Sequence, residues 1–143
     1  MAVGGLINVI FSIFGNDIDV TISPDIVHFK CNGRTESHAP IIYVSPDTHQ
    51  VLAVGTAQVP ALHIRVELFG TGGSAQANLS KQDGLAMFFR YAFSRLLKRW
   101  IFIRPRVVVH GSNSLGPILC GYHEGILREA IEKAGARECH FKS

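Results

Sequence analysis

The sequence predicts a single α/β domain built on a mixed sheet, and two observations lead to this fold class. The first half of the chain alternates apolar and polar residues with the period of strands. The second half changes to the period of helices on either side of one apolar run. The 143 residues, of which 47% are apolar and 17% charged, are enough to bury one sizeable core. We therefore expect an antiparallel meander of strands followed by a helix, a strand and a second helix.

Two strands open the predicted meander. Residues 18–23 alternate isoleucine and valine with polar residues, which indicates a half-buried first strand. A Pro-Asp pair at 24–25 separates this strand from a second β-rich run at 26–30, so the two strands are expected to form a tight hairpin. The Asn-Gly pair at 32–33 has the chemistry of a turn and ends the second strand.

Three further strands complete the predicted meander. Residues 40–44 predict the third strand, and after a turn at 45–47 residues 50–54 predict its short return partner. Residues 62–69 alternate apolar and polar side chains again. The glycine-rich residues 70–74 that follow mark a loop, and we expect this last strand at an edge of the sheet.

Helical periodicity begins after this loop. Residues 80–100 predict an amphipathic helix, and residues 106–110 are a continuous apolar run typical of a buried central strand. Residues 120–134 predict a second helix, with Gly135 where a helix C-cap belongs, and a last strand is expected near Cys139. The apolar arc of the first helix consists of Leu85, Phe89, Ala92, Phe93, Leu96, Leu97 and Trp100.

Charge and cysteine content narrow the class of protein. A formal charge of +3 is too small to imply nucleic-acid binding unless the charge is locally concentrated. Cys31, Cys120 and Cys139 form an odd, widely spaced set that suits a reducing compartment better than secretion. We therefore expect a cytoplasmic protein.

Several short segments carry a recognisable pattern. They are residues 40–44 (PIIYV), 50–57 (QVLAVGTA), 79–84 (LSKQDG), 104–109 (RPRVVV) and 128–138 (REAIEKAGARE). In order and spacing these segments resemble the bacterial actin MreB, the rod shape-determining protein. The resemblance covers essentially the whole chain but only the opening part of a full-length bacterial actin.

This resemblance implies a fold and a domain organisation. It implies one subdomain of the actin-like ATPase, ribonuclease-H-like fold, with a mixed sheet that starts as an antiparallel meander and is flanked by two helices. Residues 16–143 would form this subdomain, and residues 1–15 would form a preceding apolar or amphipathic helix. The resemblance also implies work in the bacterial cytoskeleton, in the maintenance of cell shape.

Actin-like proteins hold nucleotide between two lobes, in phosphate loops that begin at an Asp-x-Gly motif in the first hairpin of each lobe. In an ungapped alignment Asp19 is the family's aspartate and Thr21 replaces its glycine. If residues 14–17 (FGND) match the family's FSND instead, the aspartate position becomes Thr21 and the loop is shorter. Either alignment loses the glycine that lets backbone N–H groups approach a phosphate, and Pro24 removes one donor.

The resemblance therefore implies a degenerate phosphate loop at Asp19, Thr21 and Ser23. We expect no catalytic residue, no metal and no cofactor, because one short lobe cannot form a cleft between two lobes. ATP and magnesium would bind only if another chain completed the site.

The apolar segment before the first strand lies where MreB proteins often carry a membrane-binding amphipathic helix. It is too short to span a bilayer, which needs about 20 apolar residues, and it contains no Lys or Arg. It fits either contact with the inner face of the cell membrane or packing in an oligomer. The candidate contact residues are Leu6, Val9, Ile10, Ile13 and Phe14.

Residues 90–106 carry basic and aromatic side chains and no acidic residue, which is one footprint of nucleic-acid binding. The aromatic residues fall largely on the buried arc of the predicted helix, so the ordinary interpretation is a cationic solvent face over a packed core. Anionic lipid or an acidic partner protein would also suit a surface of this charge. The expected basic surface is formed by Arg95, Lys98 and Arg99.

Two further kinds of site have weaker support. A zinc set would need paired ligand spacing, and a hydrolytic group would need a nucleophile elbow, and the chain has neither. The loop 111–116 follows a central strand, where ligands bind in α/β folds, and is a candidate interaction surface. The residues considered for zinc are Cys120, His123, Cys139 and His140, and those considered for hydrolysis are His110, Ser112, Ser114 and His123.

The function expected from these observations is a non-catalytic MreB-like scaffold or interaction module of the cytoskeleton and of cell shape. We expect a homo-oligomer that binds a bacterial actin filament or membrane-bound cell-shape proteins. A second possible function is a nucleotide-binding actin-like ATPase with a composite site between chains. A third is a basic nucleic-acid-binding module.

Overall fold

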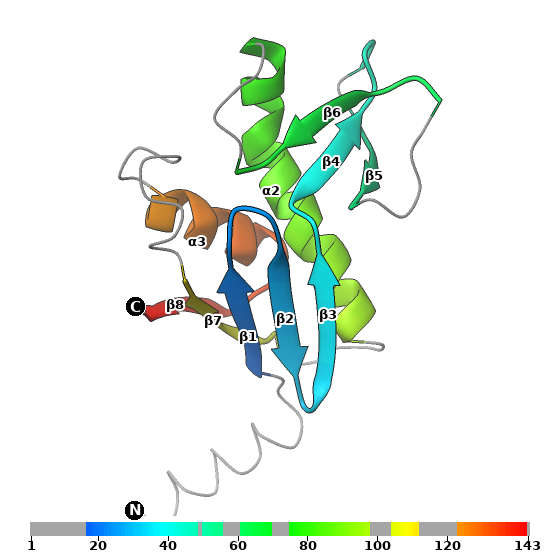
Figure 1. Ribbon diagram of the computed structural model, residues 1–143. Helices are drawn as coiled ribbons and strands as arrows, with labels where there is room; N and C mark the ends of the chain where they lie inside the picture. The colour runs from blue at the N-terminus through cyan, green and yellow to red at the C-terminus, as the bar shows by residue number, and fades with distance from the viewer. Residues whose placement is uncertain are drawn as a thin grey trace, which may run out of the picture.

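The chain folds into two β-sheets that share one long helix (Figure 1). The computed structural model describes residues 17–48, 50–55, 61–69, 75–97, 104–111 and 123–142. Its elements follow the order of six strands, a helix, a strand, a second helix and a last strand. The mixed α/β class and the two helices are therefore as predicted.

The larger sheet has five strands in the order β3-β2-β1-β7-β8. Its antiparallel part is a meander of β1 (Asp17–Ile22), β2 (Val27–Cys31) and β3 (Arg34–His38). β7 (Arg106–His110) then pairs parallel to β1, and β8 (Glu138–Lys142) pairs parallel to β7. The sheet is mixed because helical crossovers return the chain to its parallel half.

The smaller sheet has three strands in the order β5-β4-β6. β4 (Ile41–Val44) lies in the centre, between β5 (Val51–Val54) and β6 (Ile64–Glu67), and both pairs are antiparallel. β6 was predicted to be an edge strand, and this is confirmed.

The third strand of the meander was predicted wrongly. Residues 40–44 form β4 in the second sheet, and the strand that pairs with β2 is β3. The Asn-Gly pair between β2 and β3 has positive φ at both residues, 51° and 81°, as a two-residue hairpin turn requires. β3 reads RTESH, with polar residues on both faces, so it lacks the apolar alternation that identifies a strand.

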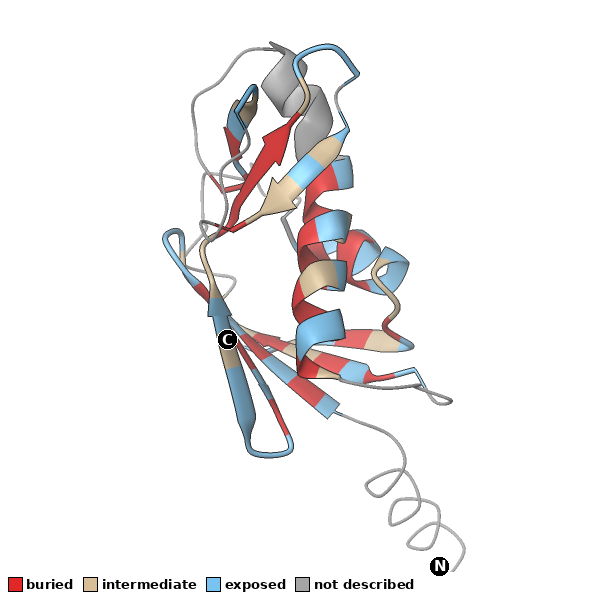
Figure 2. Ribbon diagram, turned by 90° about the vertical axis from the view of Figure 1, so that its right-hand side faces the viewer, coloured by how far each residue is buried: buried red, intermediate tan, exposed pale blue. Residues whose placement is uncertain are grey.

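Both helices pack against the same face of the larger sheet (Figure 2). α2 (Ala75–Leu96) begins before the predicted start at residue 80, and it contacts strands of both sheets. α3 (His123–Lys133) ends at the predicted cap, where Gly135 has a φ of 122° and its N–H donates to the carbonyl of Glu132. Alanine-rich and polar residues open α2, so apolar periodicity alone placed its start too late.

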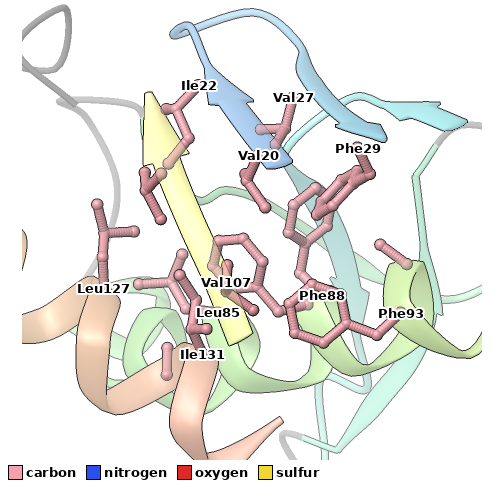
Figure 3. Packing of buried hydrophobic residues seen from close by; sticks show 14 of the residues in the cluster. Val20, Ile22, Val27, Phe29, Leu85, Phe88, Phe93, Val107, Leu127 and Ile131 are labelled. Atoms are coloured by element: carbon pink, nitrogen blue, oxygen red, sulfur yellow. The ribbon is translucent and has the colours of Figure 1, made fainter. Parts of the chain in front are cut away.

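The core lies between these helices and the larger sheet (Figure 3). Alternate residues of β1 and β2 point inward and are buried, and the residues between them are exposed. α3 contributes Leu127 and Ile131, which are both fully buried. The same cluster extends to Val66 and Leu68 beside the smaller sheet, so a single core supports both sheets.

The predicted N-terminal helix, with Leu6, Val9, Ile10, Ile13 and Phe14, lies outside the described residues. The boundary at residues 15 and 16 thus stays a prediction. Among the described helices, none combines the length and the apolar character needed to cross a membrane.

Candidate functional site

The turn between β1 and β2, where the degenerate phosphate loop was predicted, is closed by its own hydrogen bonds. The backbone N–H of Ser23 donates to the carbonyl oxygen of Ile26 at 3.1 Å, and the Ser23 hydroxyl donates to the same oxygen at 2.7 Å. The N–H of Ile26 in turn donates to Oγ of Ser23 at 3.3 Å. Pro24 has no N–H, so Asp25 contributes the remaining amide of the turn.

Asp19 and Thr21 lie on the exposed face of β1, away from the core. In the sheet register Thr21 pairs with His28 on β2 and with His110 on β7. A hydrogen bond joins Nε2 of His110 to Oδ1 of Asp19, with 3.3 Å between the two atoms. Asp19 and Thr21 are two positions apart on a strand, so both side chains face outward. The burial pattern therefore fits either alignment of the predicted phosphate loop.

These side chains line an open groove of about 680 Å³ on the exposed face of the larger sheet. The groove is polar and contains one carboxylate, two imidazoles, one ammonium group and three hydroxyls. A ligand there would be bound mainly by side chains. His28 and Ser37 are joined across β2 and β3 by a hydrogen bond of 2.7 Å. The groove is lined by Asp19, Thr21, His28, Phe29, Lys30, Thr35, Ser37 and His110.

Gly111 directly follows β7 and lies beside the end of β1. Its φ is 80°, and a Cβ atom placed on it would lie 2.6 Å from the carbonyl oxygen of Ile22. A side chain is therefore excluded for two reasons, the backbone conformation and the close approach of β1. Of the candidate loop 111–116, Gly111 is described and the remainder lies outside the described residues, as do Ser112 and Ser114.

The basic stretch is largely engaged in contacts within the chain. Arg104 donates from Nε to the carbonyl of Gly135 at 3.0 Å, and Arg90 donates from Nη2 to the carbonyl of Lys133 at 3.1 Å. Both arginines thus satisfy carbonyl groups at the C-terminus of α3, where positive charge also complements the helix dipole. Arg106 pairs with Asp17 at 2.9 Å.

Arg95 is the one member of the predicted basic surface within the described residues. Its side chain is 51% exposed, with Nε 3.7 Å from a carboxylate oxygen of Glu36 and its guanidinium carbon 5.7 Å from the ring centre of Tyr91. Lys98 and Arg99 lie outside the described residues.

The two described cysteines are buried thiols. Burial raises the pKa of Cys139 to about 11 and also raises the pKa of Cys31. Such thiols are protonated at neutral pH and are poor nucleophiles and metal ligands. Within the described residues, no three His, Cys, Asp or Glu side chains cluster closely enough to hold a metal ion, and Cys120 lies outside them.

His38 is a largely buried titratable residue that the sequence analysis did not single out. It packs against the rings of Phe29, Phe88 and Tyr91, and its Nε2 atom has no hydrogen-bond partner among the described residues. Glu36 lies 3.6 Å from that nitrogen, beyond hydrogen-bonding distance. A polar residue at the end of a polar strand gives no sequence signal of burial, because burial here comes from α2.

We expect the protein to lose stability below about pH 6.5 through His38. Burial lowers the pKa of His38 from its usual value, and Arg95 acts in the same direction while Glu36 opposes both. The unfolded chain therefore binds the proton at a higher pH than the folded chain does, and the free energy of unfolding falls as the pH falls through that window. Urea denaturation at pH 7.5 and 5.5 would measure this loss.

His38→Leu should reduce the difference between the two pH values, since leucine fills the same apolar site and does not titrate. His28→Gln is the matched control, because His28 lies on the exposed face of β2. An equal loss of stability in wild type and His38→Leu would assign the pH dependence to other groups.

Comparison with solved structures places this geometry in a known fold. Two crystal structures of MreB5 of Spiroplasma citri, one bound to ADP and one bound to AMPPNP, align with 90% of this chain at a TM-score of 0.65, with 12% and 13% sequence identity. The fold is actin-like. The sequence itself matches no protein-family model and no curated protein.

The likeness is restricted to part of the bacterial actin. The chain spans 38% of the length of the two MreB5 chains. The predicted resemblance to the actin-like fold is thus confirmed at the level of the fold, and the roles of Asp19, Thr21 and Ser23 stay predictions.

Proposed function

We propose that this chain is a non-catalytic, MreB-like scaffold module, a degenerate relative of the bacterial actin that binds partners instead of hydrolysing ATP. The actin-like fold supports the cytoskeletal part of this proposal. MreB-type proteins form filaments, which makes self-association between copies of this chain a natural part of it. Work beside the inner face of the cell membrane, in the maintenance of cell shape, completes the proposed role.

The observation that carries the non-catalytic part is the β1–β2 turn. Phosphate loops bind anions through several backbone N–H groups that point at the ligand. In this turn the amides of Ser23 and Ile26 are used internally, and Pro24 supplies none. A phosphate at this position could reach these two amides only by breaking those bonds.

A composite nucleotide site between two chains is the second candidate. MreB5 of Spiroplasma citri was crystallised with ADP and with AMPPNP, and this chain aligns with 38% of it. If another chain supplied a second lobe, the polar groove with Asp19, Thr21 and His110 would form one wall of the site.

Thermal unfolding with and without millimolar Mg-ATP separates the two candidates. A ligand at one hundred times its dissociation constant stabilises the native state by about 2.7 kcal/mol, which raises the Tm of a domain of this size by several degrees. We expect no rise. A concentration-dependent rise that is abolished by Asp19→Ala would instead establish nucleotide binding, and its dependence on protein concentration would show whether two chains share the site.

A further inference from the structure

An apolar groove of about 780 Å³ lies between the edge strand β5 and the exposed side of α2. One wall is the whole of β5, residues Val51–Val54. The other wall is a stripe of α2 at helical spacing, so both walls run along the length of the groove. From residue 87 to residue 95 the helix rises about 12 Å. The helical wall consists of Met87, Arg90, Tyr91, Ser94 and Arg95.

Two large apolar side chains are exposed along this groove. Leu52 is 48% exposed and Met87 is 40% exposed, one on each wall. Other side chains of β5 and α2 pack in or against the shared core. Leu52 and Met87 are thus exposed although the strand and the helix that carry them are well packed. Exposed apolar side chains that converge on a groove are typical of interaction sites.

The edge of β5 is not built for the addition of another strand. In the pairing with β4, Ala53 is opposite Tyr43 and Val51 is opposite Val44, so Leu52 falls in a bulge between them. A bulge in a four-residue edge strand interrupts the row of backbone groups that a new strand would use. Recognition at this groove therefore depends on side chains.

The charged residues that line the groove are both basic. Arg90 reaches the end of α3, whereas Arg95 contacts its partners Glu36 and Tyr91 through Nε and the face of its guanidinium carbon. Because the Arg95 side chain is 51% exposed, its guanidinium group can also bind a carboxylate of a partner. Among the described residues, none that lines the groove is acidic.

From these observations we infer that the groove between β5 and α2 binds an acidic amphipathic helix of a partner protein. Its apolar face would cover Leu52 and Met87, and a carboxylate on its flank would pair with Arg95. A partner helix suits the groove because it binds through its own side chains at intervals of three and four residues. It needs no hydrogen bonds from the backbone of the interrupted edge strand β5. This partner helix would be the ligand of the scaffold module proposed above, so its assignment rests on that proposed function.

Selection from a phage-displayed library of random 16-residue peptides tests the groove without a choice of ligand in advance. The selected peptides should carry apolar residues at helical spacing together with Asp or Glu. As synthetic, fluorescently labelled peptides they should bind the wild-type protein, and Leu52→Lys and Arg95→Glu should each weaken binding by roughly tenfold or more, as for central contacts of an interface. Reversing the peptide's acidic residues to Lys should restore binding to the Arg95→Glu variant.

The smaller sheet offers matched controls on its opposite edge. Leu62 is 79% exposed, and the side chain of Arg65 is 54% exposed. Leu62→Lys and Arg65→Glu make the same chemical changes away from the groove and should leave peptide binding unchanged. Selected peptides without acidic residues, or equal binding by all four variants, would overturn the inference.

The alternative occupant of the groove is a second copy of this chain. If sedimentation showed that the wild type dimerises and that Leu52→Lys makes it monomeric, a second copy would be the occupant and the inference of a partner helix would be wrong. The selection measures the groove and the Mg-ATP titration measures the phosphate loop, so either proposal can fail alone.

Discussion

Replacing Phe29 by alanine is expected to lower the free energy of unfolding by about 3–5 kcal/mol. Phe29 is fully buried on β2, and its ring lies 6.0 Å from each of the rings of Phe88, Phe89 and Phe93 on α2. The substitution would leave a cavity between the central strands and the helix, and would also remove aromatic contacts that add to the loss of buried area. The loss should exceed that caused by truncation of a partly buried aromatic side chain.

Urea denaturation followed by circular dichroism measures this loss. Phe29→Leu should have a smaller effect, because leucine fills part of the cavity. Phe141→Ala is the positional control, since Phe141 is only half-buried on β8 and lies under Arg128. If Phe29→Ala and Phe141→Ala had the same effect, the aromatic cluster would not be the centre of the core.

The second large effect is expected at Gly84, in α2. A Cβ atom placed on Gly84 would clash with Cδ1 of Ile42 and would lie 3.1 Å from Cδ2 of Leu68. The absence of a side chain is what lets the helix approach the smaller sheet. Gly84→Leu should therefore destabilise the fold by on the order of 1–3 kcal/mol through overpacking, despite the better helix propensity of leucine.

Gly125 provides the matched substitution. It lies in α3, and a Cβ atom there would have no neighbour within 4 Å. Gly125→Leu should raise the free energy of unfolding by roughly 0.5–1 kcal/mol, because only helix propensity changes. The two variants are expected to shift the denaturation midpoint in opposite directions, and shifts of the same sign would falsify the close approach at Gly84.

Local pattern was sufficient for most elements of this fold. The alternation of buried and exposed residues in β1 and β2 is visible in the sequence, as is the helical cap at Gly135. β3 was not predicted, because its side chains are polar on both faces. Its place in the sheet is set by the turn before it. No local sequence pattern indicates that β4 belongs to a different sheet from β2, because strand pairing is decided by contacts between residues far apart in sequence.

The candidate sites were less accessible to sequence reasoning. Thr21 and Pro24, on which the prediction of a degenerate phosphate loop rests, could be seen in the sequence, but the hydrogen bonds that close the β1–β2 turn could not. The role of Arg104 at the end of α3 depends on a residue 31 positions away. The groove between β5 and α2 is formed by segments on either side of the smaller sheet's last strand, so neither segment alone suggests it.

The contact of α2 with both sheets has a consequence for how the protein opens. A helix whose buried side belongs to one continuous core cannot detach from one sheet without exposing apolar surface that faces the other. The backbone amides in the middle of α2 should therefore exchange with solvent only through global unfolding, and the two sheets should share one rate. A partner bound to the smaller sheet would then slow amide exchange in the larger sheet as well, because both sheets open only when the shared core opens.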